Sequence, residues 1–384
     1  MWGDEMQTWI IEPRDPLITR DARPFGPTLG AEATSLVFPL PSTTTGALRE
    51  RAGMTAGGVF DRSRTSEVQR IRVRGPLLVQ LDEGGEISRW FSPAPADVLL
   101  VRHERSIVMR QLAPLAVPVG ALHSLPDGLV PIGPYPIEPA SRASGPRYWD
   151  WSLLETWLLT PQDNIVMSDN LGIGGPLLEQ RIHVRIASET QAPIEGFLFQ
   201  TRGLEFMVEG RRLALAVVSD VSLDQSTDGI APLGGERRMA TWRMSTQKLP
   251  SCPEALIQTI LEQRACRVIL LTPAAFTTGY RPTWLLEPRE GVTPYLRAAL
   301  VPSRQIASGW DLDRQRPKPL RWLVPAGAVF FVELTGSRDA LRRWAQHYWM
   351  ESVSDEEQDR RDGFGLAVLG SWSGELRPME VHHA

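Results

Sequence analysis

Three apolar segments in the second half of the chain have the length and composition of buried strands. They run from Val268 to Thr272, from Ile306 to Asp311 and from Ala328 to Leu334. A fourth, G-F-G-L-A-V-L-G-S-W, begins at Gly363. Short apolar runs bounded by glycine, proline or polar residues are typical of strands in the interior of a sheet. The sequence therefore predicts a small buried sheet in this half of the chain.

Two amphipathic segments accompany these strands. Ser251 and Glu254 form a capping box, which satisfies free N–H groups at a helix start, and the apolar face of the helix follows at once. A second helix is expected from Ser337 to Tyr348, and residues 273–300 have room for a third. The resulting order is β-α-β-β-α-β, the ferredoxin-like arrangement, which RNA-recognition modules also use.

The first half of the chain repeats part of this pattern. Leu213 to Val221 is an unbroken apolar run suited to a central strand. A tight turn at Gly234-Gly235 follows it, just as Gly363-Phe364-Gly365 opens the last strand of the second half. The same order fits the first half if residues 57–165, rich in proline and glycine from Ser92 onward, are largely an insertion.

These patterns predict an α+β fold of two tandem ferredoxin-like domains. The N-terminal domain, residues 1–248, holds the insertion, and the C-terminal domain, residues 249–384, ends in the glycine-rich turn and strand. Asp150 to Leu159 is expected to be a helix that starts at a capping box of Ser152 and Glu155.

A stretch near the N-terminus has the features of an anion-binding site. A strand at Thr8 to Ile11 leads into a long loop with Arg14, Arg20 and Arg23, and a run of hydroxyl residues from Ser42 to Thr45 leads into a helix expected at Ala47 to Arg51. Free N–H groups at a helix start attract anions, and arginine clamps phosphate oxygens. The alternative is an ordinary N-cap with solvated arginines. G-K-[ST] is absent, so the stretch is not a nucleotide P-loop.

The charge of the chain limits how it could meet a nucleic acid. Its 41 basic and 45 acidic residues give a formal net charge of −4, so a nucleic-acid site must be a local patch. Lys248 and Lys318 are the only lysines. Arginine is the better fork for phosphate, although a GC-rich genome gives the same bias.

Composition also bears on location. The two cysteines, Cys252 and Cys266, form neither a disulfide framework nor a metal site, which fits a reducing compartment. The N-terminal residues lack a secretory signal, and no apolar run has the length of a membrane span. We therefore expect a cytoplasmic protein.

The sequence contains no pattern that predicts catalysis, a metal or a cofactor. None of the six histidines has metal-ligand spacing such as H-E-x-x-H. The acidic run Asp355-Glu356-Glu357 with Asp359 lacks the glycine turn of a calcium loop and is typical of a solvated surface. We expect a non-catalytic protein without a metal or cofactor.

Four motifs give the chain a family resemblance. They are P-L-I-T-R-D-A-R-P-F-G from Pro16, F-P-L-P-S-T-T-T-G-A-L-R from Phe38, G-I at 172–173 with G-F-L-F at 196–199, and L-G-G-E-R-R from Leu233. Together they resemble the third subunit of the type III-B CRISPR (Cmr) effector complex, a RAMP superfamily protein, from about Ile11 to Trp372. The resemblance implies a protruding β-hairpin arm at about 172–199.

The resemblance also implies a function. In this family the subunit holds the 5′ tag of the CRISPR RNA (crRNA), docks the large polymerase-like subunit, adjoins the backbone RAMP subunits and meets target RNA indirectly, as part of an antiviral ribonucleoprotein. Phosphate clamps, glycine turns that admit a ligand backbone, and stacking aromatics would bind the RNA. The residues expected at the RNA are Arg14, Arg20, Arg23, Phe25, Ser42, Thr43, Thr44, Gly46, Arg49, Arg51, Gly172, Gly234, Gly235, Arg237, Arg238, Gly363, Phe364 and Gly365.

Two other functions stay open at this point. RAMP enzymes that cleave RNA to mature crRNA often use a histidine near the RNA groove of the N-terminal domain, and no histidine precedes His103 here. A scaffold that contacts only protein is compatible with thirteen tryptophans and a negative net charge.

Overall fold

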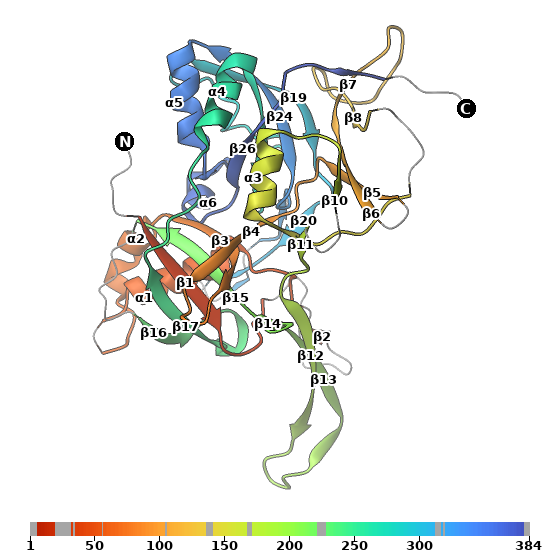
Figure 1. Ribbon diagram of the computed structural model, residues 1–384. Coiled ribbons are helices and arrows are strands. Elements are labelled where there is room, and N and C mark those ends of the chain that lie inside the picture. The colour runs from red at the N-terminus through yellow and green to blue at the C-terminus, as the bar shows by residue number, and fades with distance from the viewer. Residues whose placement is uncertain are drawn as a thin grey trace. The chain divides into compact units, whose positions relative to one another are not determined.

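The chain folds into two units that alternate along the sequence. Unit 1 contains residues 1–88, 175–248 and 306–322, and unit 2 contains residues 89–174, 249–305 and 323–384 (Figure 1). The computed structural model describes residues 6–19, 32–33, 35–55, 57–103, 106–135, 141–166, 171–220, 228–311, 316–317 and 319–379. Each unit therefore draws on segments that are distant in sequence.

Unit 1 is built on an antiparallel sheet. Its main strands are β1 (Gln7–Pro13), β3 (Val73–Leu81), β15 (Arg211–Ser219) and β17 (Met239–Ser245), in the order β3-β15-β1-β17. The third of these strands in the sequence therefore lies between the first and the second. Helix α1 (Pro41–Ala52) follows the first strand. Smaller elements are β2 (Glu32–Ala33), α2 (Thr65–Val68), β14 (Met207–Val208), β16 (Gly229–Pro232) and β22 (Arg316–Pro317).

The central strand carries much of the core of unit 1. Trp9, Ile10 and Ile11 in β1 have no exposed surface, so this strand is buried on both faces. Its neighbour β15 contributes the unbroken run from Leu213 to Ser219, in which every residue is buried. Runs of this kind, apolar without alternation, favour the interior of a sheet, as the sequence predicts here.

A long hairpin, which we call the arm, extends from unit 1 (Figure 1). It consists of β12 (Leu177–Ile186) and β13 (Pro193–Glu205), paired from Leu177 opposite Glu205 to Val184 opposite Leu198, with a bulge before Ile186. The arm thus spans residues 177–205 instead of 172–199. Gly196 to Phe199 lies inside β13 and does not flank it, because pairing continues to Glu205 at the base.

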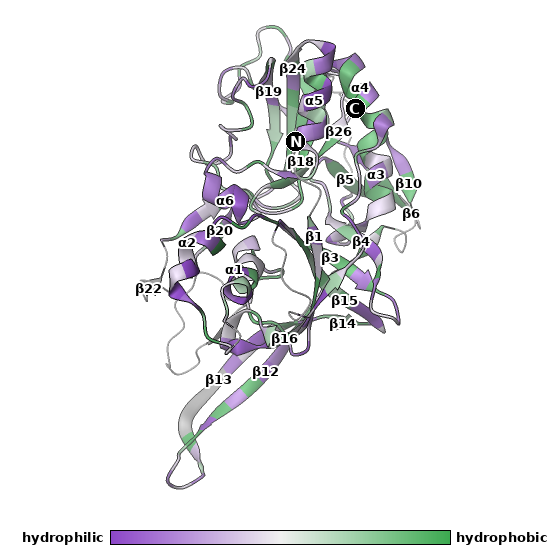
Figure 2. Cartoon of the chain, turned by 90° about the vertical axis from the view of Figure 1, so that its left-hand side faces the viewer, coloured by the Kyte–Doolittle hydropathy of each residue, from purple (hydrophilic) through white to green (hydrophobic). Residues whose placement is uncertain are grey.

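The two faces of β12 differ in chemistry. Leu178, Ile182, Val184 and Ile186 alternate with charged or polar residues, which include Glu179, Arg181, His183 and Arg185. Successive side chains of a strand point to opposite faces, so one face of β12 is largely apolar and the other is charged. Figure 2 shows this alternation along β12 as green and purple bands. The four apolar side chains are between 41% and 66% exposed.

Unit 2 contains a second antiparallel sheet. Strands β18 (Ala265–Leu270), β19 (Val292–Leu300), β24 (Val329–Gly336) and β26 (Leu366–Ser371) lie in the order β19-β24-β18-β26, with β25 (Glu351–Ser352) beside β26. Again the third strand separates the first from the second. Helices α5 (Arg338–Tyr348) and α6 (Glu357–Arg361) follow the third strand, and α4 (Glu254–Gln263) precedes the first. The predicted α+β class is confirmed.

The segment after β18 differs from expectation. Residues 273–291, all described, contain no helix, because Pro273, Pro282 and Pro288 interrupt any helical run. The second strand is β19 at residues 292–300, in which buried side chains alternate with half-buried or exposed ones from Val292 to Ala298, as a strand requires. The segment 306–311 contributes only the short strands β20 (Gln305–Ala307) and β21 (Trp310–Asp311), so its expected place in the sheet is wrong.

The helix starts also differ in part from the expected caps. Helix α3 (Trp151–Leu159) is capped by Asp150, whose Oδ1 accepts a hydrogen bond from Ser152 N at 3.0 Å. Helix α4 has no side-chain cap, so the box of Ser251 and Glu254 does not form. Helix α1 begins at Pro41 and not at Ala47, since proline fits the first turn of a helix.

Residues 89–174 pack with the C-terminal segments inside unit 2. They form β4 (Ile87–Pro93, which starts in unit 1), β5 (Val98–His103), β6 (Ser106–Gln111), β7 (Ala113–Ala116), β8 (Ile132–Gly133), β9 (Tyr148–Asp150), α3, β10 (Asn164–Val166) and β11 (Gly172–Ile173). From later in the chain come β27 (Arg377–Pro378) and β23 (Arg321–Leu323), which begins in unit 1 and ends in unit 2. Among the described residues, no helix is both long and apolar enough to cross a membrane.

A buried ion pair fastens this segment to the sheet of unit 2. Arg267 on β18 and Asp97 have no exposed side-chain surface, and Arg267 Nη1 lies 2.5 Å from Asp97 Oδ2. Trp157 on α3 donates its indole N–H to the same carboxylate at 3.0 Å, and Arg267 Nη2 donates to the Trp157 carbonyl at 2.6 Å. Arg267 Nε donates to Ser371 O at 2.8 Å. One guanidinium thus ties α3 to β18 and β26.

Candidate nucleic-acid interface

The glycine turn of unit 1, Gly234 to Arg238, connects β16 to β17. Gly234 has φ 73°, and Glu236 and Arg237 have φ 55° and 49°, so three residues lie in the left-handed region. Gly235 N donates to Ile18 O at 2.7 Å. A Cβ on Gly234 would lie 2.7 Å from that same carbonyl oxygen. The glycine turn therefore makes room for the protein's own backbone at Ile18.

The segment Pro16 to Thr19 is also held from a second side by the base of the arm. Leu17 N donates to Leu204 O at 2.9 Å, and Leu204 N donates to Leu17 O at 2.8 Å. A Cβ on Gly203 would lie 2.6 Å from the Cβ of Pro16. Two glycines, one in the arm and one in the turn, thus let this segment pass between them. It leads to Arg20, Arg23 and Phe25, which lie outside the described residues.

A small depression, the arm-base hollow, lies where these three pieces meet. It is lined by Pro16, Ile18, Glu179, Arg181, Thr201, Gly203 and Arg238. Arg181 Nε lies 2.5 Å from Glu179, and Arg238 Nη2 lies 3.1 Å from Glu236. Arg14 and Arg237, at the two chain segments that meet here, are exposed. Arg14 N donates to Met239 O at 2.9 Å, so Arg14, Arg237 and Arg238 of the predicted set lie in one region of unit 1.

Arg181 was missed by the sequence reasoning. It lies on the charged face of β12, and the alternation of charged and apolar residues from Leu177 to Ile186 is the signal that could have found it. The opposing residue on β13 is Thr201, whose Oγ1 lies 2.9 Å from Nε2 of His183. On β12 this face carries charged or polar side chains from Glu179 to Arg185.

The start of α1 lacks the arrangement expected for an arginine clamp. Ser42 and Thr43 are half-buried in the first turn, and the Thr44 hydroxyl is buried and donates to Pro41 O at 3.1 Å. Gly46 is exposed. Arg49 and Arg51 are in the last turn, about 12 Å along the axis from the helix start.

Those two arginines have structural contacts. Arg49 Nη2 donates to Ile71 O at 2.7 Å. The guanidinium of Arg51 lies 5.2 Å from the centre of the Trp242 ring. Burial lowers the pKa of Arg51, and the Asp228 carboxylate partly offsets that effect. Arg49 thus joins α1 to the segment before β3, and Arg51 packs α1 against β17.

The other predicted glycines belong to unit 2. Gly172, with φ 142°, lies so close to the Tyr148 carbonyl that a Cβ would collide with it. Phe364 is 1% exposed, and Gly365 N donates to Pro273 O at 2.8 Å. The ring of Phe364 therefore has almost no surface on which a base could stack. The side chain of Trp310 lies outside the described residues.

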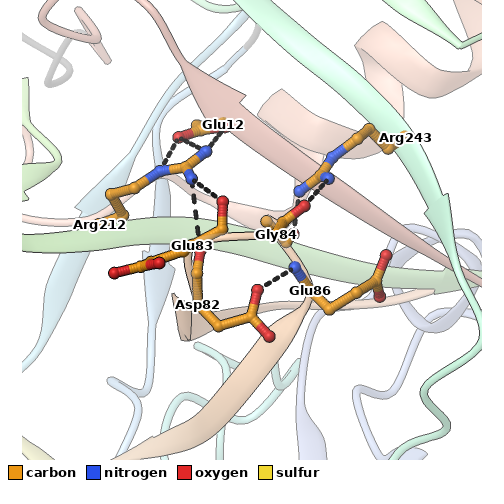
Figure 3. A network of polar contacts seen from close by, with 8 residues as sticks. Glu12, Asp82, Glu83, Gly84, Glu86, Arg212 and Arg243 are labelled. Carbon is orange, nitrogen blue, oxygen red and sulfur yellow. Dashed lines mark hydrogen bonds and ion pairs between the residues drawn. The ribbon is translucent and has the colours of Figure 1, made fainter.

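A polar network fixes the turn between β3 and β4 in unit 1 (Figure 3). Arg212 forks onto Glu12 with Nε–Oε1 and Nη2–Oε2 distances of 3.1 and 3.0 Å. Its Nη1 donates to the carbonyls of Asp82 and Glu83 at 3.3 and 3.4 Å. Arg243, on β17, donates to the carbonyls of Gly84 and Gly85. These two arginines are thereby engaged with the protein itself.

Asp355, the first residue of the acidic run in unit 2, anchors residues 277–284. The Asp355 carboxylate accepts hydrogen bonds from the backbone N–H groups of Thr277, Thr283 and Trp284 at 2.8, 2.7 and 2.9 Å. Burial raises the pKa of Asp355, but these hydrogen bonds outweigh it and leave the pKa below its ordinary value. Among the described residues, no group of three His, Cys, Asp or Glu side chains could hold a metal ion.

Asp355 should make the stability of unit 2 depend on pH. The pKa of Asp355 is lowered in the folded state. Its carboxylate therefore adds to the free energy of unfolding above the ordinary aspartate pKa of about 4, and this stabilisation is lost as the pH falls through the folded-state pKa. Asp355→Asn is expected to cost about 1–2 kcal/mol at pH 7, because its amide turns a donor toward backbone donors. Urea unfolding at several pH values would measure this. If the free energy of unfolding fell equally with acid in the wild type and in the variant, Asp355 would not be the source of the pH dependence.

Comparison with known proteins identifies the family. A family model described as CRISPR-associated protein (Cas_Cmr3) matches residues 9–372. The chain belongs to the Cas_Cmr3 family. Membership confirms the resemblance to the third Cmr subunit, and the chain is a subunit of a type III-B Cmr effector complex. A comparison with curated proteins gave no match.

Solved structures similar to this Cas_Cmr3 protein come from CRISPR complexes. A chain of the type III-B Cmr-beta complex bound to cognate target RNA is 16% identical, with a TM-score of 0.47, and the match covers 84% of this chain and 86% of that one. The same complex with AMPPnP gives 15% identity, a TM-score of 0.46 and the same coverage. A chain of the type III-A Csm3-Csm4 subcomplex gives 9% identity, a TM-score of 0.34, and coverage of 86% and 94%.

Proposed function

We propose that this Cas_Cmr3 protein is the non-catalytic crRNA-binding subunit of its complex. It holds the 5′ tag of the crRNA, docks the large polymerase-like subunit, adjoins the backbone RAMP subunits and meets target RNA indirectly. The observation that carries this proposal is that Arg181 and Arg238 line the arm-base hollow, with the exposed Arg14 and Arg237 on the adjoining backbone, where Arg14 N donates to Met239 O at 2.9 Å. Arginine is the residue best suited to fork onto phosphate, so this local patch suits RNA despite the negative net charge.

The architecture supports the same proposal. Both sheets place the third strand between the first and second, as in a split β-α-β-β-α-β unit. We interpret them as two tandem ferredoxin-like sheets. Among the described residues, unit 1 has the helices α1 and α2 after its first strand, and unit 2 has α5 and α6 after its third. RNA-recognition modules use this arrangement.

Binding of tagged crRNA tests the proposed function. We expect the protein, alone or with its large-subunit partner, to bind crRNA more tightly than the same RNA with a scrambled 5′ tag, and to lose affinity steeply as salt rises. Replacing Arg14 and Arg237 together with glutamine should weaken binding about tenfold or more. The measurement is a titration at several salt concentrations. Equal binding of both RNAs would contradict recognition of the 5′ tag, and no binding in either setting would leave a protein-only scaffold as the better interpretation.

The same RNA distinguishes a binding subunit from an RNA-cleaving relative. His183 lies on the same face of β12 as Arg181, with Nε2 2.9 Å from Thr201 Oγ1, so it is the histidine to test for cleavage. We expect the crRNA to stay intact after long incubation with the pure protein. Cleavage that disappears in His183→Ala would overturn the non-catalytic assignment.

A further inference from the structure

We propose that the loop from Pro118 to Gly128, which we call the tip loop, inserts its apolar side chains into an apolar groove on a neighbouring protein subunit of the complex. The tip loop joins β7 to β8 in unit 2 (Figure 1). This contact goes beyond the proposed function, which places RNA at unit 1 and assigns no surface to the protein partners. Protein neighbours exist for this chain because it belongs to a Cmr effector complex.

The tip loop leaves its apolar side chains in water. Every residue from Pro118 to Gly128 is exposed. Val119 and Leu122 are 107% and 100% exposed, and Leu125 is 38% exposed. Single apolar residues on a surface are ordinary, but several of them in one short loop form the kind of patch that marks an interaction site.

The base of the same loop is packed and hydrogen-bonded. Leu115 in β7 and Leu129 after the loop are only 2% and 8% exposed. Leu115 N donates to Pro131 O at 2.8 Å, and Val130 N donates to Arg297 O on β19 at 2.9 Å. Strand β27 pairs with β7 on its other side. The fold thus buries the apolar residues at the base and holds those of the tip loop away from it, and a fixed base lowers the entropic cost of binding.

The charge of this part of the chain favours a protein partner over RNA. Arg110 and Arg142 are consecutive basic residues in the sequence, so β7, the tip loop and β8 contain no arginine or lysine. The tip loop has one acidic residue, Asp127, and one histidine, His123. Binding to RNA or to anionic lipid relies on basic residues. An apolar loop with almost no charge instead matches the core of a protein interface, where charged residues are depleted.

A double substitution in the full-length chain, Val119→Ser with Leu122→Ser, tests the contact. It removes both apolar side chains without adding charge, and it should keep the thermal stability of the free protein because neither side chain is packed. Each purified protein subunit of the Cmr complex is titrated against wild type and variant. We expect one subunit to bind the variant about 100-fold more weakly, because two apolar side chains are no longer buried. Tagged crRNA should bind both proteins equally.

The matched control is Ile165→Ser. Ile165 is a 66% exposed apolar residue on β10 of the same unit, outside the tip loop. Its replacement should leave the affinity for every subunit unchanged. Hydrogen exchange then locates the contact in the assembled complex. The amides of residues 119–125 should exchange several-fold more slowly in the complex than in the free protein, while those of residues 164–166 should not change.

The outcomes separate the tip-loop contact from the proposed function. Equal affinity of wild type and double variant for every subunit, or unchanged exchange of the tip loop in the complex, would overturn the contact and leave the proposed function standing. Weaker crRNA binding by the variant would mean that RNA meets the loop, and a change in self-association alone would mean that a second copy covers it. Either result also rules out a groove on another subunit. If wild type bound no crRNA, the proposed function would fail while the tip-loop contact stood.

Discussion

Asp97→Ala should destabilise unit 2 by about 3–5 kcal/mol, the expected cost of leaving a buried charge without its partner. Asp97 and Arg267 have no exposed side-chain surface, and Asp97 also accepts the indole N–H of Trp157 at 3.0 Å. The variant leaves a buried guanidinium and a buried indole N–H unsatisfied at once. Chemical denaturation followed by tryptophan fluorescence would measure the loss, because Trp157 lies at the pair.

Two further variants show whether the cost comes from the unpaired charge. Glu333→Gln breaks the half-exposed pair of Arg297 and Glu333 in the same unit and should cost less than about 1 kcal/mol. Replacing both buried partners, as Asp97→Leu with Arg267→Met, should recover much of the stability, because no buried charge then remains. If Asp97→Ala were as mild as Glu333→Gln, the pair would not be what fastens α3 to β18.

The second large effect is expected from Gly234→Ala. An alanine at φ 73° costs about 1–2 kcal/mol, and its Cβ would lie 2.7 Å from Ile18 O, which forces a backbone shift that costs about 1–3 kcal/mol more. We expect the contact of the turn with Ile18 to open. The Gly235 amide, which donates to Ile18 O, should then exchange its hydrogen much faster than in wild type. RNA binding should fall with it, since Arg238 loses its fixed position.

Gly46→Ala is the matched control for this substitution. Gly46 lies inside α1, and a Cβ there would meet nothing within 4 Å. This replacement should stabilise α1 by about 0.5–1 kcal/mol, because alanine suits a helix interior better than glycine. An equally small effect of both substitutions would contradict the role assigned to Gly234.

Local patterns in the sequence were sufficient to predict several elements of both sheets. The runs that became β15, β18, β24 and β26 are apolar and short, and the helices α3 and α5 have clear apolar faces. Strand β19 was missed because Pro294 and polar residues interrupt its pattern, while a helix was expected from the fold arrangement. Such errors arise where tertiary burial, and not local preference, decides the structure.

The candidate site was harder to predict because its contacts join distant residues. The glycine turn was found from its composition, but its partner Ile18 is more than 200 positions earlier, so the backbone it admits could not be identified. Arg49 and Arg51 were assigned to RNA from their closeness to a helix start that in fact lies at Pro41. Asp97 and Arg267 are 170 positions apart, and no local pattern in the sequence relates them.

The interleaving of the two units has a consequence for synthesis on the ribosome. Asp97 emerges 170 residues before Arg267, and translation at about 5–20 residues per second separates them by roughly 10–30 s. During that interval the strands that complete the sheet of unit 1 emerge, while α3 and its buried tryptophan wait for β18. Helix α3 therefore lacks its buried ionic anchor until the second half of the chain arrives, although the apolar contacts of Trp157 with Met109, Trp149 and Leu171 can form earlier.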